Sequence, residues 1–508
     1  MNLGELFEFA VDRGSNRLAF VDEEHSYTYR ELNIEVNRIA SSLKKLGIGH
    51  RDRVMVLLKN RLQTVCLFWA LQKIGAVFTP VNFNRSSSDI GYCINDVEPK
   101  AIIYEDFVYS LIPKVNLEFK PIYISLDPDS GDISYSELLK NGSESFELHI
   151  GIDDEIALML YTSGTSGIPK GVPRSHKNEY ASTMAHIIQN RYELFDSTIG
   201  VMPLYHTMGV RSLLAMAILN GKYVAIPDFD GETILRYVAN EHITDLYMIP
   251  RMYHELLKTK HFGDFDISSI RAIGYAGAPM TPELTLDCER ALKPKVFMNH
   301  YGSTEIYTFS TCTSLNVKPG CAGKPGINQN IRLISVAADA DINDKVGKNQ
   351  IGQIIAHMGT DEAFKGYWNR PEVTREVIRD GWYFTGDIGI YDDEDDLFVV
   401  GRIDEMVISG VDHVFPFKVE QVLYGHPSVN EVAVVGEKDD RWGQIVVAYV
   451  VPKNSQLSPL DLDRFCKKNG TLSNYERPRK YFFVKELPKG PTGKLLRKQL
   501  KPKGEESK

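Results

Sequence analysis

The chain has 508 residues, more than a single hydrophobic core usually serves, so we expect two or more domains. Hydrophobic residues make up 43% of the chain and charged residues 25%, and the net charge of −9, with both signs interspersed, argues against a nucleic-acid partner. No apolar run reaches the roughly 20 residues that cross a bilayer, and Met1–Leu6 lacks the layout of a signal peptide. We therefore expect a cytoplasmic protein with no membrane partner.

Helical and strand-like stretches alternate through the first 400 residues. Apolar residues at helical spacing predict helices at Tyr29–Leu43 and Leu67–Ile74. Buried strands are predicted after each helix, at Val54–Leu58 and Ala76–Pro80, and again at Ile156–Leu160. This alternation favours an α/β fold in which layers of helices cover parallel sheets.

A smaller α+β unit is predicted near the C-terminus, after a strand at Leu397–Val400 that Gly401 and Arg402 bring to an end. Its expected elements are helices at 418–423 and 459–468, strands at 429–435 and 444–451, and a basic tail at 489–503. We predict an N-terminal domain over 1–402, a hinge at 403–404 and a mobile C-terminal lid over 405–508, whose last five residues are disordered.

The cysteines do not form a recognisable site. No Cys-x-x-Cys pair is present, so we expect buried, small apolar residues and neither a disulfide framework nor a zinc site. They are Cys66, Cys93, Cys288, Cys312, Cys321 and Cys466.

A loop rich in glycine and hydroxyl residues, Tyr161–Gly171, is typical of a phosphate-binding site. Glycines let the backbone approach an anion, and the amides, hydroxyls and Lys170 ammonium all donate hydrogen bonds. Pro169 stands where a P-loop needs glycine, so this is not a Walker motif. The expected ATP-binding positions are Thr162, Ser163, Gly164, Thr165, Ser166, Gly167 and Lys170.

This loop resembles the phosphate-binding signature of the adenylate-forming superfamily, which includes acyl- and aryl-CoA ligases, peptide-synthetase adenylation domains and firefly-type luciferases. Tyr301–Glu305 is similar to its second signature, in which Tyr301 and Gly302 lie against adenine. The resemblance implies that Thr304 reaches the AMP phosphate and that Glu305 is the metal ligand that holds Mg²⁺. The small residues Ala276, Gly277 and Ala278 resemble the segment beside adenine.

Two further parts of the pattern follow in order. Asp387 and Arg402 resemble the family's ribose-binding pair, whereas the acidic run 392–396 between them is expected to be a solvated hairpin turn. Lys494 stands at the position of the family's catalytic lysine, whose ammonium bridges carboxylate and phosphate oxygens. The resemblance covers about residues 5–500 and implies ATP, Mg²⁺ and a thiol acceptor.

The acid-binding residues are taken from the same resemblance, whose closest group is the benzoate and 4-chlorobenzoate CoA ligases. Tyr205–Thr207 lacks the aspartate with which adenylation domains pair a substrate ammonium, so an aromatic acid is expected rather than an amino acid. The implied pocket is Ala185, His206, Thr207, Met208, Tyr247, Ala276, His300, Tyr307 and Thr308, with His206 also counted among the catalytic residues. The polar members favour a hydroxyl or amino group on the substrate ring.

On the thiol side, the resemblance implies a CoA site and a hinge at Asp404. The CoA positions are Gly410, Trp442, Tyr475, Arg477 and Arg85. Val411 stands where glycine is usual and Arg85 is shifted by one position, so a carrier protein stays open as the acceptor. A medium-chain fatty acid stays open as the substrate, and a luciferase-type enzyme and a non-catalytic nucleotide-binding module are less favoured. A monomer or homodimer is expected.

Overall fold

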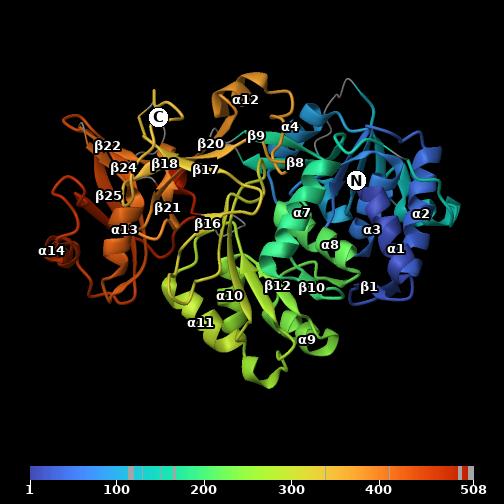
Figure 1. The fold of residues 1–508 in the computed structure, drawn as a ribbon, viewed down its shortest axis with the longest axis horizontal. Coiled ribbons are helices and arrows are strands. Elements are labelled where there is room, and N and C mark those ends of the chain that lie inside the picture. Colours follow the sequence, from blue (N-terminus) through green and yellow to red (C-terminus); the bar gives the residue numbers. More distant parts are fainter. Residues whose placement is uncertain are drawn as a thin grey trace. The chain divides into compact units, whose positions relative to one another are not determined.

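Strands of the described residues assemble into four sheets, which belong to two units of the chain (Figure 1). The structure is a computed structural model that describes residues 1–112, 119–128, 130–149, 151–163, 168–337, 339–410, 412–489 and 495–500. Unit 1 comprises Met1–Pro319, Pro325–Asn330 and Met358–Ile378. Unit 2 comprises Gly320–Lys324, Ile331–His357 and Arg379–Lys508.

The first sheet of unit 1 has seven strands in the order β7-β6-β5-β3-β4-β8-β9. All its pairs are parallel except the last, in which β8 and β9 form a hairpin. In the sheet's order, the strands are β7 (Ile133–Ser134), β6 (Ile122–Ser125), β5 (Ala101–Tyr104), β3 (Arg53–Leu57), β4 (Val77–Pro80), β8 (Ile156–Ser163) and β9 (Pro169–Ser175). The predicted phosphate-binding loop therefore lies between the two strands of the hairpin.

A second sheet of unit 1 runs in the order β15-β14-β13-β12-β10-β11-β1-β2. Its inner pairs are parallel, and β15 and β2 are antiparallel to their neighbours. The strands are β15 (Ser310–Cys312), β14 (Val296–Tyr301), β13 (Ala272–Tyr275), β12 (Asp245–Met248), β10 (Ser197–Gly200), β11 (Lys222–Ala225), β1 (Leu18–Val21) and β2 (Ser26–Thr28). Both adenine segments of the sequence pattern follow the carboxyl ends of adjacent strands, β13 and β14.

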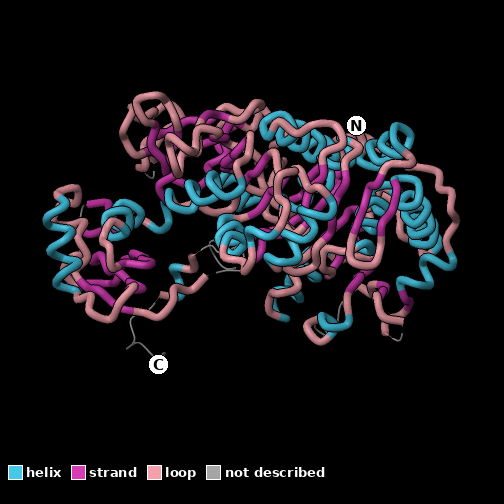
Figure 2. Tube along the Cα trace, turned by 90° about the horizontal axis from the view of Figure 1, so that it is seen from below, coloured by secondary structure: helices cyan, strands magenta, loops and turns pink. Residues whose placement is uncertain are grey.

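Helices alternate with these strands along the chain, and Figure 2 draws the helices in cyan and the strands in magenta. Helix α3 is apolar on every face and is buried, as expected for a helix covered on all sides. The helices of unit 1 are α1 (Leu3–Gly14), α2 (Tyr29–Lys45), α3 (Leu62–Ile74), α4 (Ser87–Val97), α5 (Asp106–Tyr109), α6 (Tyr135–Asn141), α7 (His176–Asn190), α8 (Thr207–Leu219), α9 (Gly231–Glu241), α10 (Pro250–Leu257), α11 (Pro282–Leu292), α12 (Pro371–Val377) and the 3₁₀ turn η1 (Phe262–Asp264).

Unit 2 contains two sheets whose strands are mostly antiparallel. One has the order β17-β18-β20 with β21 beside β20: β17 (Ile331–Ile334), β18 (Gly352–His357), β20 (Trp382–Tyr391) and β21 (Leu397–Arg402). The other has the order β23-β22-β25-β24 with β26 beside β25: β22 (Val407–Ser409), β23 (Asp412–Val414), β24 (Val429–Asp439), β25 (Gly443–Pro452) and β26 (Lys480–Phe483). Helices α13 (Pro416–Tyr424) and α14 (Pro459–Asn469) pack on the second sheet through a valine-rich cluster, and the 3₁₀ turns are η2 (Ile403–Glu405) and η3 (Arg497–Gln499). Two short strands, β16 (Lys324–Pro325) and β19 (Ile378–Arg379), span the points where the chain passes from one unit to the other.

Most predicted elements are confirmed, and so is the α/β fold class. Helix α3 begins at Leu62 rather than Leu67, because the apolar residues of its first turn are also buried. The predicted end of a strand at Val400 is wrong: β21 continues to Arg402, which still pairs with Asp387 of β20. All six cysteines are buried and none forms a disulfide, and the acidic run forms a turn in which the Asp392 amide donates to the Asp396 carbonyl.

Within the described ranges, no helix has the length and apolar character needed to cross a membrane. The division into a domain over 1–402, a hinge and a lid stays a prediction.

A buried ionic cluster joins three elements of unit 1. Arg174 of β9 donates from Nε to Glu179 Oε1 of α7 at 2.8 Å, and Arg211 of α8 pairs with the other carboxylate oxygen. All three side chains are fully buried. Figure 1 shows α7 and α8 side by side in the green part of the ribbon. Burial lowers the pKa of Arg174 to about 10 and that of Arg211 to about 9, so both stay charged at neutral pH.

Replacing Glu179 by Gln is expected to lower the free energy of unfolding by about 3–5 kcal/mol, because two guanidinium groups then stay buried without their counter-charge. Denaturant unfolding at neutral pH measures the difference. Glu144→Gln is the matched control, since its partner Arg38 is on the surface and such pairs contribute only about 0–1 kcal/mol. Equal losses in the two variants would contradict the structural role of Glu179.

Candidate active site

The hairpin of β8 and β9 brings Lys170 next to the start of the phosphate-binding loop. Thr162 is directly opposite Lys170, and Ser163 is opposite Pro169. Residues that face each other across an antiparallel pair share one face of the sheet, so the Lys170 and Thr162 side chains are neighbours. The other predicted loop residues, Gly164, Thr165, Ser166 and Gly167, lie outside the described residues.

Tyr367 links Lys170 to the predicted magnesium ligand. The Lys170 ammonium lies 4.4 Å from the centre of the Tyr367 ring, and the Tyr367 hydroxyl donates to Glu305 Oε1 at 2.7 Å. Glu305 is buried and accepts this hydrogen bond on one oxygen, while a carboxylate has further lone pairs on both. Tyr367 thus contacts both an ammonium and an oriented carboxylate, two groups that suit a bound phosphate and its Mg²⁺.

Backbone contacts hold Glu305 in this position. Arg174 of the ionic cluster donates from Nη1 to the carbonyl oxygens of Glu305, at 3.0 Å, and of Glu362, at 2.7 Å. The Phe364 amide donates to the Glu305 carbonyl at 2.9 Å. The charged cluster under the site therefore supports the loop that carries Thr304 and Glu305.

The adenine segments lie at the ends of two adjacent parallel strands. Ala276–Ala278 follows β13, and Tyr301 ends β14, with Tyr275 opposite Asn299 in the register. Gly277 has a φ of 83°, a left-handed conformation that favours glycine. A Cβ at Gly302 would lie 1.8 Å from the Tyr307 carbonyl oxygen, so only glycine fits there. Ligands of α/β sheets commonly bind at this edge.

Polar aromatic side chains form a buried network near the predicted acid pocket. Asn190 Nδ2 lies 3.0 Å from both His186 Nδ1 and His300 Nε2. The Tyr307 hydroxyl is 2.9 Å from His186 Nδ1 and donates to the Tyr247 hydroxyl at 2.9 Å. Tyr307 and Tyr247 are therefore satisfied by the protein itself, which differs from the expectation that the Tyr307 hydroxyl faces the substrate.

Other polar atoms of this network are buried and have no hydrogen-bond partner in the described part of the chain. They are His300 Nδ1, His186 Nε2, Asn190 Oδ1 and Thr308 Oγ1. Burial lowers the pKa of His300 to about 3 and holds that of His186 well below its usual range, so both imidazoles are neutral at physiological pH. Neutral donors and acceptors suit a polar group without charge.

Predicted apolar members of the pocket lie beside this network. Met208 and Tyr247 belong to one buried cluster with Met202 and Ile249, and the half-buried Ala276 packs against it. Ala185, fully buried on α7, directly precedes His186.

His206 and Thr207 lie at the start of α8. Burial, together with the positive charge of Arg85, lowers the pKa of His206 to about 4. A neutral His206 cannot stabilise an anion by charge, but it can donate or accept a hydrogen bond. Thr207 Oγ1 is buried and makes no hydrogen bond within the described ranges.

The predicted ribose residues meet in unit 2. Asp387 and Arg402 are paired in the register of β20 and β21, and Arg402 Nη1 donates to Asp387 Oδ1 at 3.0 Å. Arg402 Nε also donates to Asp404 Oδ1 at 3.0 Å, and the two carboxylates raise the pKa of Arg402 despite its burial. Asp404, the predicted hinge, lies in η2.

The predicted CoA residues of unit 2 divide into two pairs. Gly410, with a φ of 68°, donates its amide to the carbonyl of Trp442, whose ring is 47% exposed. Arg477 pairs with Asp463 at 2.5 Å and with Asn474 Oδ1 at 3.0 Å, and Tyr475 is exposed nearby in the chain. Val411 and the predicted catalytic Lys494 lie outside the described residues.

Sequence reasoning missed Tyr367, His186 and Asn190. The spacing of His186 and Asn190 along α7, four residues apart, could have shown that they share a helix face with each other. No local pattern connects Tyr367 to Glu305, because the two are brought together only by the fold.

Comparison with known proteins identifies the family. The AMP-binding enzyme family matches residues 7–368, and the AMP-binding enzyme C-terminal domain matches residues 418–494. A long-chain-fatty-acid–CoA ligase of Mycobacterium tuberculosis is 31% identical, covering 93% of this chain and 92% of that protein. The 4-coumarate–CoA ligase 1 of Arabidopsis thaliana is 30% identical, covering 94% of this chain and 88% of that protein. A 2-succinylbenzoate–CoA ligase of Bacillus cereus is also 30% identical, covering 97% of this chain and 96% of that protein.

Solved structures are similar over nearly the whole chain. ATP-bound MatB from Rhodopseudomonas palustris has a TM-score of 0.87 and 26% identity, covering 98% of both chains. The o-succinylbenzoate CoA synthetase of Bacillus subtilis, in complex with ATP and a magnesium ion, has a TM-score of 0.83 and 26% identity, covering 97% and 98%.

Because the His300 pKa falls from 6.5 to about 3 on folding, the unfolded chain binds a proton between these pH values that the folded chain does not. Stability is therefore lost as the pH falls from 6.5 towards 3. His300→Gln removes this linkage and is expected to flatten the decline by up to about 1.4 kcal/mol per pH unit. Unfolding free energies from pH 8 to 4 measure the slope, with pH 8 as the reference. Parallel curves for variant and wild type would show that His300 is not the buried neutral group.

Proposed function

The chain belongs to the AMP-binding enzyme family and is an ATP-dependent acid–thiol ligase of the acyl/aryl-CoA type; we propose that its acid is a planar aromatic carboxylate with an uncharged polar substituent. In the first half-reaction the carboxylate oxygen attacks the α-phosphorus of ATP, forming acyl-AMP and releasing pyrophosphate. In the second, the sulfur of CoA attacks the acyl carbonyl, forming the thioester and releasing AMP.

The grouping of Lys170, Tyr367 and Glu305 is the observation that carries the adenylation chemistry. The lysine ammonium supplies positive charge for the phosphates, and the Glu305 carboxylate offers the hard oxygen ligand that magnesium prefers. When bound, magnesium neutralises charge on the phosphate oxygens. Thr304, next to Glu305, is proposed to donate its hydroxyl to the AMP phosphate, and Ala276–Ala278 with Tyr301 and Gly302 to form the adenine site.

The buried polar network supports the proposed acid. The relatives named above act on a long-chain fatty acid, on 4-coumarate and on 2-succinylbenzoate, so family membership leaves the acid open. Here His300 Nδ1 and Thr308 Oγ1 are buried with no partner among the residues described, and the His300 ring lies 5.7 Å from that of Tyr247. An apolar tail would leave them unpaired, which costs about 1–3 kcal/mol for each group, whereas a hydroxyl or amino group satisfies them.

The remaining roles rest on the sequence pattern and are part of the same proposal. Lys494 bridges the reacting carboxylate and phosphate, and Asp387 with Arg402 binds the ribose. Residues 405–508 act as a lid that turns about Asp404 between the half-reactions. Gly410, Trp442, Tyr475, Arg477 and Arg85 bind the CoA arm and nucleotide.

A panel of acids tests the substrate class through pyrophosphate release. We expect kcat/KM for 4-hydroxy- or 4-aminobenzoate, or for 4-coumarate, to exceed that for the 4-chloro analogues by about tenfold, the value of one hydrogen bond. Thr308→Val is nearly isosteric and is expected to reduce this preference without lowering stability, because its hydroxyl has no protein partner in the described structure. Highest kcat/KM with octanoate or a long-chain acid would overturn the proposal.

Tyr367→Phe tests the metal-binding role of Glu305. Loss of the hydroxyl frees the carboxylate to rotate, so the Mg²⁺ concentration for half-maximal pyrophosphate release should rise by about 10–100-fold. The ring that faces Lys170 is kept in this variant. Tyr253→Phe is the control, because Tyr253 is also a buried tyrosine but donates to the Leu246 and Gly274 carbonyls. If the Mg²⁺ concentration for half-maximal pyrophosphate release changes equally in both variants, Tyr367 does not position the metal ligand.

A further inference from the structure

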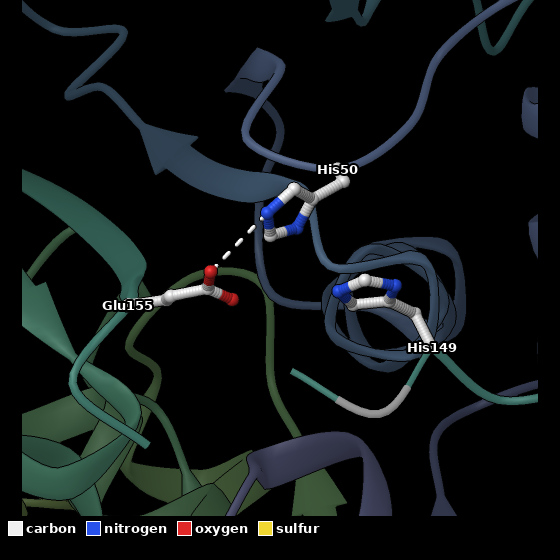
Figure 3. A group of neighbouring side chains, drawn as sticks. All are labelled: His50, His149 and Glu155. Carbon is white, nitrogen blue, oxygen red and sulfur yellow. Dashed lines mark ion pairs between the residues drawn. The ribbon is translucent and has the colours of Figure 1, made fainter. Parts of the chain in front are cut away.

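Two histidines and a glutamate converge on the surface of unit 1, at the start of β8. His50 lies in the turn between α2 and β3, and His149 and Glu155 precede β8 (Figure 3). One ligand atom from each side chain lies within 4.8 Å of the others. Figure 3 shows the three side chains pointing into a common space. None of them belongs to the ATP, acid or CoA sites discussed above.

The contacts within this group leave one ring nitrogen, His149 Nε2, without a hydrogen bond in the described structure. His50 Nε2 and the Arg51 guanidinium lie 3.2 Å and 3.1 Å from the same oxygen, Glu155 Oε1. The rings of His50 and His149 are 4.4 Å apart, tilted by 38°. His149 Nε2 is shielded from solvent and has no hydrogen-bond partner among the described residues.

Two glycines make room for this arrangement. A Cβ at Gly151 would lie 2.6 Å from Glu155 Oε2 and 3.2 Å from His149 Nε2, so the space between these two atoms is open only because residue 151 has no side chain. The His149 ring lies on Gly75, where a Cβ would come within 2.5 Å of Cδ2. His149 is also held through its amide, which donates to the Lys73 carbonyl at 2.9 Å. The unused ring nitrogen is therefore fixed beside the free edge of the carboxylate.

We propose that His50, His149 and Glu155 form a binding site for a divalent transition metal ion of the zinc type. Two imidazole nitrogens and one carboxylate oxygen are a common zinc ligand set, completed by water. Tetrahedral coordination places ligand atoms roughly 3.3 Å apart. The three ligand atoms here lie within 4.8 Å of one another, so the side chains need to move closer together to bind the ion. Glu155 Oε2 is the ligand oxygen, which leaves Arg51 paired with Oε1.

The site has a structural consequence for the chain. Glu155 immediately precedes β8, whose other end carries Tyr161 and Thr162, and its carbonyl accepts from the amide of His176, the first residue of α7. A metal ion thus fastens the turn before β3 to the strand that leads to the phosphate-binding loop. The ion stabilises the folded state by an amount that rises with its concentration relative to its dissociation constant. It takes no part in the reaction.

Chelator-treated protein is titrated with ZnCl₂, and binding is followed by calorimetry and by the rise in thermal midpoint. CoCl₂ serves as a spectroscopic probe, since a tetrahedral site gives strong visible absorption. We expect one saturable ion per chain, a higher midpoint with Zn²⁺, and no such rise with MgCl₂, because magnesium prefers oxygen ligands. Glu305→Gln is expected to bind Zn²⁺ as the wild type does, which excludes the catalytic site.

Two variants test the ligands independently of folding. His149→Ala removes a ligand, whereas Gly151→Ala keeps all three and fills the space between two of them; both are expected to weaken Zn²⁺ binding at least tenfold. His261→Ala, an exposed histidine beside Asp264, is the matched control and is expected to bind normally. Wild-type affinity in Gly151→Ala and His149→Ala, or no saturable Zn²⁺ binding by the wild type, would overturn the proposal.

Discussion

The fully buried carboxylate of Glu179, held between Arg174 and Arg211, is the interaction on which the site depends. Three charges without access to water are tolerable only as a group, because each guanidinium would be costly alone. The group joins β9, which carries Lys170, to α7, which carries His186, and to α8, which begins at Thr207. Through Arg174 it also holds the backbone of Glu305 and Glu362.

The polar groups around this cluster form two regions, one with charged side chains and one with neutral side chains. Lys170 and Glu305 are the charged groups that we propose for the phosphates, where charge is needed. His186 and His300 lie in the acid region, and burial keeps both neutral. Arg211 lies 5.2 Å over the Tyr307 ring and thus contacts the neutral network through an aromatic face. The same low dielectric favours paired charges in one place and uncharged hydrogen-bonding groups in the other.

Strand β8 connects two sites of different chemistry. Its carboxyl end leads towards the proposed phosphate-binding loop, for which we propose the oxygen ligands of Glu305 and the ammonium of Lys170. Its amino end follows Glu155, where imidazole nitrogens dominate. The ligand types make the two ends selective for different ions, magnesium with phosphate at one and a softer transition metal at the other.

The sequence alone determined what is local. The apolar periods predicted α2, β3, β4, β8, α13 and α14, and glycine and hydroxyl residues marked the loops that bind phosphate and adenine, since these depend on neighbouring residues only. The partners of those loops depend on topology. Tyr367 reaches Glu305 across 62 residues, and Tyr307 reaches His186 across 121. No pattern of period two or 3.6 encodes such contacts, because they arise from the order of strands in a sheet and the packing of helices on it. The acid network and the His50–His149–Glu155 group were therefore decided by the tertiary structure. It alone sets the burial that keeps His186 and His300 neutral.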